Sequence, residues 1–198
     1  AIYEDSMAAA AKAAETENAV HLSDSSWAGY YDRPHTLMEV YLVLMAEAVQ
    51  QLPEPPTHIF LQAGVGGLAV ACAAYARKVW GTSPRVIVVE PDVAPAIYAS
   101  MIAGQSTITP GPASAMGRLD CKEPSLIALK GLARDAKDFL LISEEEAERG
   151  SATLASIGLP STPSGAAGLA GLLAASEGAN HIGLNTHSRV LAILSEEA

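Results

Sequence analysis

The sequence is poor in positive charge and has no long uninterrupted apolar run. Its 198 residues include 12 Lys and Arg against 22 Asp and Glu, which gives a formal net charge of −10. An acidic protein is repelled by phosphate backbones and by acidic lipids, so we expect no binding to nucleic acids or membranes. No apolar run reaches the ~20 residues that cross a bilayer, and the longest candidate, residues 40–49, is interrupted by Glu47.

Cysteine is also scarce, with only Cys72 and Cys121. Two cysteines do not form a disulfide framework. They could pair, but reduced thiols in a cytoplasmic protein are the better expectation. Asp120 and Glu123 flank Cys121, yet the spacing matches no zinc pattern, so we expect no metal site.

The length suits one domain, or one domain with a fragment of another. Hydrophobic residues make up 49% of the chain, which is enough for a core and argues against global disorder. Glu4 and Asp5 stand where a secretory signal would carry basic residues, so we expect no such signal. A first residue other than Met suggests a trimmed or cut chain.

Strand-like and helix-like segments alternate along the chain. Short apolar runs predict strands over residues 58–61, 85–89, 139–142 and 190–194. Helical spacing or composition predicts helices over residues 8–14, 34–49, 68–79, 95–103, 126–133 and 164–176, and another beginning after Ser143, with Glu146 completing a capping box. This alternation predicts an α/β fold with a mostly parallel twisted sheet and helices on both faces.

A glycine-rich loop, Gly64-Val65-Gly66-Gly67, lies between a predicted strand and a predicted helix. Glycines let several backbone N–H groups approach a phosphate, and the helix N-terminus adds a positive field. The alternative is a tight turn that binds nothing. No Lys-Ser/Thr pair follows the loop, so it is not a P-loop, and its spacing does not match the dinucleotide-binding fingerprint.

Asp24 lies in a polar loop beside Trp27. A loop carboxylate near an aromatic ring can act as a base whose pKa is tuned by burial. The composition of the loop alone favours a simpler role as a turn former or helix cap.

Five segments, taken in order, resemble diaminopropionate ammonia-lyases. They are Asp24-Ser-Ser-Trp-Ala-Gly-Tyr30, Phe60-Leu-Gln-Ala-Gly-Val-Gly-Gly67, Val88-Val-Glu-Pro91, Leu119-Asp-Cys-Lys-Glu-Pro-Ser125 and Ser164-Gly-Ala-Ala-Gly-Leu169. Together they extend over most of the chain. The resemblance implies a fold-type II pyridoxal 5'-phosphate (PLP) enzyme, similar to tryptophan synthase β and threonine deaminase.

The resemblance also implies roles for particular residues. Those expected to hold the cofactor phosphate through backbone N–H groups are Gly64, Val65, Gly66, Gly67 and Leu68. Ser195 is expected to face the pyridine nitrogen, and Asp24 to act as an acid or base on one face of a small amino-acid substrate. The implied reaction is α,β-elimination of 2,3-diaminopropionate to pyruvate and ammonia. Threonine or serine dehydratase activity, or a non-catalytic anion-binding module, remain alternatives.

Three departures from the family pattern matter. The lysine that binds the cofactor covalently belongs to the N-terminal half of the family, and no lysine here has that setting. All five lysines are predicted to lie on the surface: Lys12, Lys78, Lys122, Lys130 and Lys137. Pro163 stands before Ser164 where the family has Glu, and the chain ends three residues after Ser195.

These departures shape the expected organisation. We expect residues 1–198 to form a C-terminal portion, mainly the large cofactor domain, that is inactive alone. Its partner would be the missing N-terminal half or a second copy of the chain.

Overall fold

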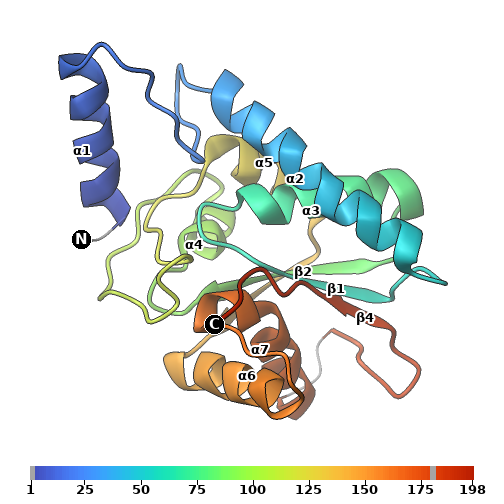
Figure 1. Cartoon of the computed structure of the whole chain (residues 1–198). Helices are drawn as coiled ribbons and strands as arrows, with labels where there is room; N and C mark the ends of the chain where they lie inside the picture. The colour runs from blue at the N-terminus through green and yellow to red at the C-terminus, as the bar shows by residue number, and fades with distance from the viewer. Residues whose placement is uncertain (1–2, 179–181) are drawn as a thin grey trace.

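A four-stranded parallel sheet forms the centre of the computed structural model, which describes residues 3–178 and 182–198 (Figure 1). The strands are β1 (His58–Gln62), β2 (Arg85–Pro91), β3 (Asp138–Ile142) and β4 (Val190–Ala192), in the order β3-β2-β1-β4. β1 pairs with β2, as predicted, with His58 opposite Arg85 and Gln62 opposite Val89. β2 is two residues longer than the predicted strand and β4 two residues shorter.

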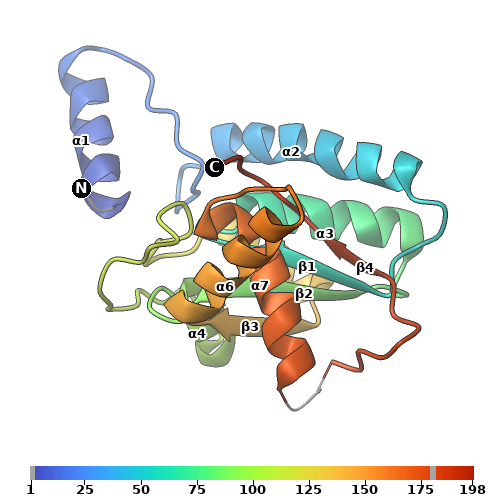
Figure 2. The ribbon, with the colours of Figure 1, turned by 60° about the horizontal axis from the view of Figure 1, so that its bottom comes forward.

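Helices cover both faces of the sheet, which confirms the predicted fold class (Figures 1 and 2). Their bounds are α1 (Tyr3–Thr16), α2 (Asp32–Gln51), α3 (Gly67–Trp80), α4 (Ala96–Ala103), α5 (Leu126–Asp135), α6 (Glu144–Ser156) and α7 (Pro163–Glu177). In both views α2 and α3 lie on one side of the sheet and α6 and α7 on the other, while α1 stands apart. α1 buries none of its residues.

The pleat of β1 sends alternate side chains into two apolar layers. Ile59 and Leu61 join the cluster beneath α2, α3 and α5, whereas Phe60 joins the cluster against α6 and α7. Because both faces are covered, β1 is buried along its whole length. This explains why continuous apolar runs, without alternation, mark the strands of this fold.

Small residues bring α7 very close to the sheet. A Cβ built on Gly171 would lie 2.7 Å from Val89 Cγ2, and one built on Gly168 would lie 2.9 Å from Gln62 Oε1. The close approach places Gly165, in the first turn of α7, within hydrogen-bond distance of the Gln62 side chain. The Gly/Ala-rich composition of this helix therefore positions it over the end of β1.

Two carboxylates, Glu146 and the buried Glu90, organise helix N-termini. The predicted capping box is confirmed: Ser143 N donates to Glu146 Oε2 (2.7 Å) and Glu146 N donates to Ser143 Oγ (3.2 Å). Glu90, at the end of β2, accepts from Ile97 N (2.8 Å) and Tyr98 N (2.7 Å) in the first turn of α4. Glu90 is only 1% exposed, and burial raises its pKa to about 7 in spite of these two bonds.

One surface prediction is wrong. The side chain of Lys122 is only 12% exposed, and its Nζ donates to Val93 O (3.0 Å), Pro112 O (2.8 Å) and Asp120 Oδ1 (2.6 Å). Lysine is rarely buried unless it is paired. Here two irregular connections, one before α4 and one after it, supply two carbonyls and a carboxylate that need a donor, so the ammonium lies inside.

The two thiols, Cys72 and Cys121, are free and buried, as expected for reduced cysteines. Over the described ranges, none of the helices combines the length and the apolar character needed to cross a bilayer. The same residues form no cluster of three or more His, Cys, Asp or Glu suited to hold a metal ion.

Candidate functional site

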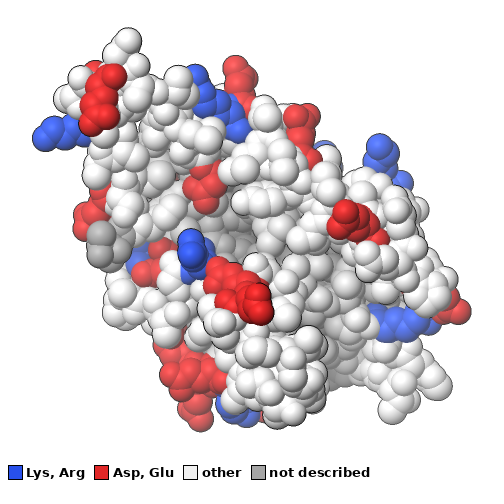
Figure 3. Space-filling view, viewed as in Figure 1, with Lys and Arg blue, Asp and Glu red and all other residues white. Residues whose placement is uncertain are grey.

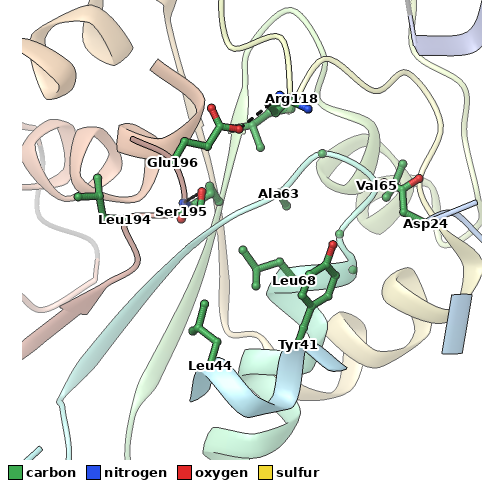
Figure 4. Close-up of a pocket in the computed structure, with 15 residues that line it drawn as sticks. Asp24, Tyr41, Leu44, Ala63, Val65, Leu68, Arg118, Leu194, Ser195 and Glu196 are labelled. Atoms are coloured by element: carbon green, nitrogen blue, oxygen red, sulfur yellow. Dashed lines mark hydrogen bonds and ion pairs between the residues drawn. The ribbon is translucent and has the colours of Figure 1, made fainter. Parts of the chain in front are cut away.

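A cavity of about 370 Å³ lies at the carboxyl ends of β1 and β4, where parallel sheets commonly bind ligands (Figure 4). Every site residue predicted from the sequence lines it: Asp24, Gly64, Val65, Gly66, Gly67, Leu68 and Ser195. Figure 3 shows that this face of the molecule is hollowed, with side chains of both charges at the rim. Residues more than 170 positions apart in sequence are thus brought to one place.

Two glycines of the loop are required by the fold itself. Gly66 has φ +96°, and a Cβ there would lie 2.8 Å from Ile97 Cδ1 and 2.9 Å from Ala128 Cβ. A Cβ on Gly64 would lie 3.0 Å from both Arg118 O and Cys121 Sγ. The presence of these two residues is therefore explained by packing and backbone conformation, without any ligand.

Gly67 is different. A Cβ there would meet only side-chain atoms of Met38 and Tyr41, at 3.6 Å or more, which is ordinary contact. Gly67 opens α3, and the first N–H groups of a helix have no acceptor within it. The first turn of α3 contains no acidic side chain, and Gly67 and Leu68 both line the cavity. This donor set and the helix dipole fit a phosphate group.

Ser195 lies across the cavity from this helix end and follows β4. Its Oγ accepts a hydrogen bond of 2.9 Å from Gln62 Nε2, which also donates to Ile193 O (3.0 Å) and Gly165 O (3.3 Å). Gln62 is 2% exposed, and its Oε1 is buried without a hydrogen-bond partner in the described structure. A hydroxyl at this position fits a heterocyclic ring nitrogen.

Asp24 lies at the other side of the glycine loop, near Val65 (Figure 4). Its Oδ1 accepts a hydrogen bond of 2.6 Å from the hydroxyl of Tyr3. Burial raises the pKa of Tyr3, and the hydrogen bond to Asp24 raises it further. Burial also raises the pKa of Tyr41, with a smaller contribution from the Asp24 charge. Both phenols therefore remain protonated beside the carboxylate.

The Asp24 loop and the glycine loop are joined through the start of α5. Ser26 Oγ lies 2.7 Å from Ser125 Oγ, and Leu126 N donates to Ser26 O (3.0 Å). Ser125 N in turn donates to Val65 O (3.0 Å). Ser125 is fully buried. This network holds Asp24 and the loop in a fixed relation.

Cys121 is a packing group beneath the glycine loop. Burial raises the pKa of its thiol to about 12, and the Asp24 charge adds to this effect. A neutral thiol is a poor nucleophile. Cys121 therefore supports the loop from below and does not act as a reactive group.

An ion pair spans the rim of the cavity, where Arg118 Nε lies 3.5 Å from Glu196 Oε1 (Figure 4). The Arg118 side chain is 82% exposed, so the pair contributes little to stability.

Sequence patterns did not indicate several lining residues, namely Tyr41, Gln62, Arg118 and Glu196. Gln62 and Arg118 had signals that were not used: Gln62 lies within the glycine-loop segment, and Arg118 directly precedes another of the quoted segments. Within residues 3–178 and 182–198, the lining of the cavity includes no lysine.

Comparison with known proteins places the site in a family. The family model described as "Pyridoxal-phosphate dependent enzyme" matches residues 1–196. Diaminopropionate ammonia-lyase of Salmonella typhimurium is 37% identical over 134 residues, which are 64% of this chain and 33% of that protein. The Escherichia coli enzyme is 34% identical over 155 residues, 75% of this chain and 38% of that protein. The aligned part is thus little more than a third of these relatives' length.

Solved structures support the same family assignment. The E. coli diaminopropionate ammonia-lyase in complex with D-serine matches with a TM-score of 0.89 and 30% identity, over 98% of this chain and 53% of that chain. Threonine deaminase isoform 2 of Solanum lycopersicum matches with a TM-score of 0.81 at 16% identity, over 94% and 51%, which shows a shared fold. The chain therefore belongs to the pyridoxal-phosphate dependent enzymes of fold type II, and it is similar to diaminopropionate ammonia-lyases in both sequence and structure.

Proposed function

We propose that the chain forms one side of the active site of a PLP-dependent diaminopropionate ammonia-lyase, which converts 2,3-diaminopropionate to pyruvate and ammonia. The observation that carries the proposal is a single cavity lined by the N-terminus of α3, Ser195 and Asp24. One group suits a phosphate, one a ring nitrogen and one a proton transfer. The relatives named above support the choice of reaction.

Each group has a distinct task in this proposal. The backbone N–H groups at the start of α3 hold the phosphate, and the helix dipole stabilises its charge. The Ser195 hydroxyl contacts the ring nitrogen and orients the ring. When bound, PLP supplies an electron sink for the carbanion formed at the substrate Cα.

Asp24 moves the proton at the substrate Cα in this proposal. The hydrogen bond from the Tyr3 hydroxyl to Oδ1 fixes the orientation of the Asp24 carboxyl group. Asp24 therefore serves only the face of the substrate that is turned toward it. A base on one face removes the Cα proton of only one enantiomer.

A second function is favoured for this chain by itself. Because no lysine of the described residues lines the cavity, the chain has no amine there to bind the cofactor covalently. A non-catalytic anion-binding role therefore fits the isolated 198-residue chain, and catalysis requires a lysine-bearing N-terminal half.

Pyruvate formation from 2,3-diaminopropionate tests this division of roles. The chain with PLP should yield no pyruvate, and the chain combined with a lysine-bearing N-terminal half should yield pyruvate with two ammonia molecules for each pyruvate, because both amino groups of the substrate are released. Turnover by the chain alone would overturn the need for the second half. If the combined, folded enzyme eliminated water from serine or threonine and ignored 2,3-diaminopropionate, the ammonia-lyase proposal would be wrong.

A further inference from the structure

We propose that Gln62 is a positioning residue that fixes the direction of the Ser195 hydroxyl proton, so that this hydroxyl acts only as a donor toward the cavity. The inference rests on the proposed PLP site and goes beyond it. It assigns a role to a buried amide that contacts no ligand itself, and it makes the site select an unprotonated ring nitrogen.

The orientation of the Gln62 amide follows from its neighbours. Two of the three atoms around its terminal nitrogen are backbone carbonyl oxygens, Ile193 O at 3.0 Å and Gly165 O at 3.3 Å. A carbonyl oxygen only accepts hydrogen bonds. Turning the amide over would place its own oxygen against these two acceptors, so the nitrogen must face them.

The same nitrogen lies 2.9 Å from Ser195 Oγ. The amide has two N–H groups, and its two shortest contacts, to Ser195 Oγ and Ile193 O, take them, while Gly165 O is a longer third contact. Because an amide NH2 cannot accept, the serine oxygen is the acceptor. The hydroxyl proton of Ser195 must therefore point elsewhere, and Ser195 lines the cavity. The amide converts a group that can donate or accept into one that presents a donor.

A donor at this position distinguishes the two forms of a pyridine ring. An unprotonated ring nitrogen accepts the hydroxyl proton, whereas a protonated one needs an acceptor. Ser195 Oγ would accept from both Gln62 and a pyridinium only if its own proton found a third partner, and the described residues record none. The arrangement therefore lowers the pKa of a ring nitrogen held here.

The cost of this arrangement is visible in the structure. Gln62 Oε1 is buried and has no hydrogen-bond partner among the described residues, and it faces the Cα of Gly168. A buried polar atom without a partner is destabilising. An apolar residue of similar size would avoid that cost, so the presence of glutamine points to the work of its nitrogen.

The test uses 4'-deoxypyridoxine 5'-phosphate, labelled with 15N in the ring, and the 198-residue chain. This probe has the phosphate and the ring nitrogen but no aldehyde, so it needs no lysine. Its free ring nitrogen is protonated at neutral pH, and the 15N chemical shift reports the protonation state directly. Binding to the wild-type chain should move the signal to the unprotonated value.

Gln62→Met removes the donor and keeps the volume. The Ser195 oxygen, no longer occupied by the amide, can then accept from the ring, so the bound nitrogen should keep its proton. The affinity at neutral pH should change by about five- to tenfold, as for one hydrogen bond, and its dependence on pH should flatten. A purely structural clamp would instead weaken binding equally at every pH and leave the 15N shift at the wild-type value.

Ser195→Ala supplies a second, independent variant, because it leaves the amide's two carbonyl contacts in place. Adding Gln62→Met to Ser195→Ala should have no further effect on the 15N shift, since Gln62 acts only through the hydroxyl. A protonated ring nitrogen in the complex with the wild-type chain would overturn the inference and leave the PLP site standing. Failure of the wild-type chain to bind the probe at the glycine loop would overturn the site and the inference together.

Discussion

The hydroxyl of Tyr3 donates a hydrogen bond of 2.6 Å to Oδ1 of Asp24 and so joins the first turn of α1 to the cavity. α1 buries none of its own residues, yet it contributes a contact to the residue proposed to move the Cα proton. The next residue extends this link, because Glu4 Oε1 accepts from Lys122 N (2.9 Å). α1 is thus tied to the site through its first turn.

Asp24→Asn should separate the two enantiomers of 2,3-diaminopropionate. In the enzyme completed with its lysine-bearing half, kcat/KM for one enantiomer should fall by about 100-fold or more, as for loss of a general base, because a base on one face reaches one Cα–H. The other enantiomer should lose much less. Asp32→Asn, on the exposed first turn of α2, is the control and should change neither. Equal losses for both enantiomers would make Asp24 a structural residue.

Gly67→Asp should weaken phosphate binding without unfolding the chain. The new side chain has room beside Met38 and Tyr41, and a carboxylate at a helix N-terminus stabilises the helix by ~0.3–1 kcal/mol. The same carboxylate repels a phosphate at that position. Titration calorimetry with 4'-deoxypyridoxine 5'-phosphate should show at least about tenfold weaker binding.

Gly67→Asn is the matched control, because it has nearly the same shape and no charge. It should retain most of the affinity. If both variants bound the probe as the wild-type chain does, the phosphate would lie elsewhere.

Lys122→Met should destabilise the chain by about 2–4 kcal/mol, because it leaves the largely buried Asp120 carboxylate and two carbonyls without their donor. Urea unfolding followed by circular dichroism measures the change. Lys130→Met, on an exposed part of α5, is the control and should stay within about 0.5 kcal/mol of the wild type. A similar small effect for Lys122 would mean that its three bonds contribute nothing net.

Stability should fall as the pH rises from about 4.5 to about 7, because burial raises the pKa of Glu90 over that range. The folded chain holds this proton where the unfolded chain has already lost it, so folding is favoured at the acidic end. Over this pH range Glu90 should lower the free energy of unfolding by up to about 3 kcal/mol. Urea unfolding at several pH values should show the slope in the wild type and a flatter profile in Glu90→Gln. Equal slopes would place the Glu90 pKa near its ordinary value.

The elements of the fold followed from local sequence, because the two central strands, β1 and β2, are buried on both faces and appear as continuous runs such as Val86–Val89. The helices were marked by glycine, proline and the Ser143 cap. The end of β4 was not predictable in this way. Residues 193 and 194 continue its apolar run, but the pairing of β4 with β1 ends at Ala192, opposite Phe60.

The site was predicted in part. The glycine loop, Asp24 and Ser195 came from a pattern and a family resemblance. Tyr3 and Gln62 did not, because their roles arise from partners 21 and 133 positions away. No local pattern marks such a pair. Lys122 was misplaced for the same reason, since the groups that make its burial favourable are assembled only by the fold.

Near the cavity, the parallel pairing of β1 with β4 ends before the pairing of β1 with β2 does. β1 pairs with β2 over five residues but with β4 over only three, so Leu61 and Gln62 have no partner residue in β4. Beyond that point the side chain of Gln62, and not the backbone, connects β1 to Ser195. A flat ligand would occupy the space that two further residue pairs between β1 and β4 would fill. The room beside Gln62 is therefore set by the point at which the pairing of β4 with β1 ends.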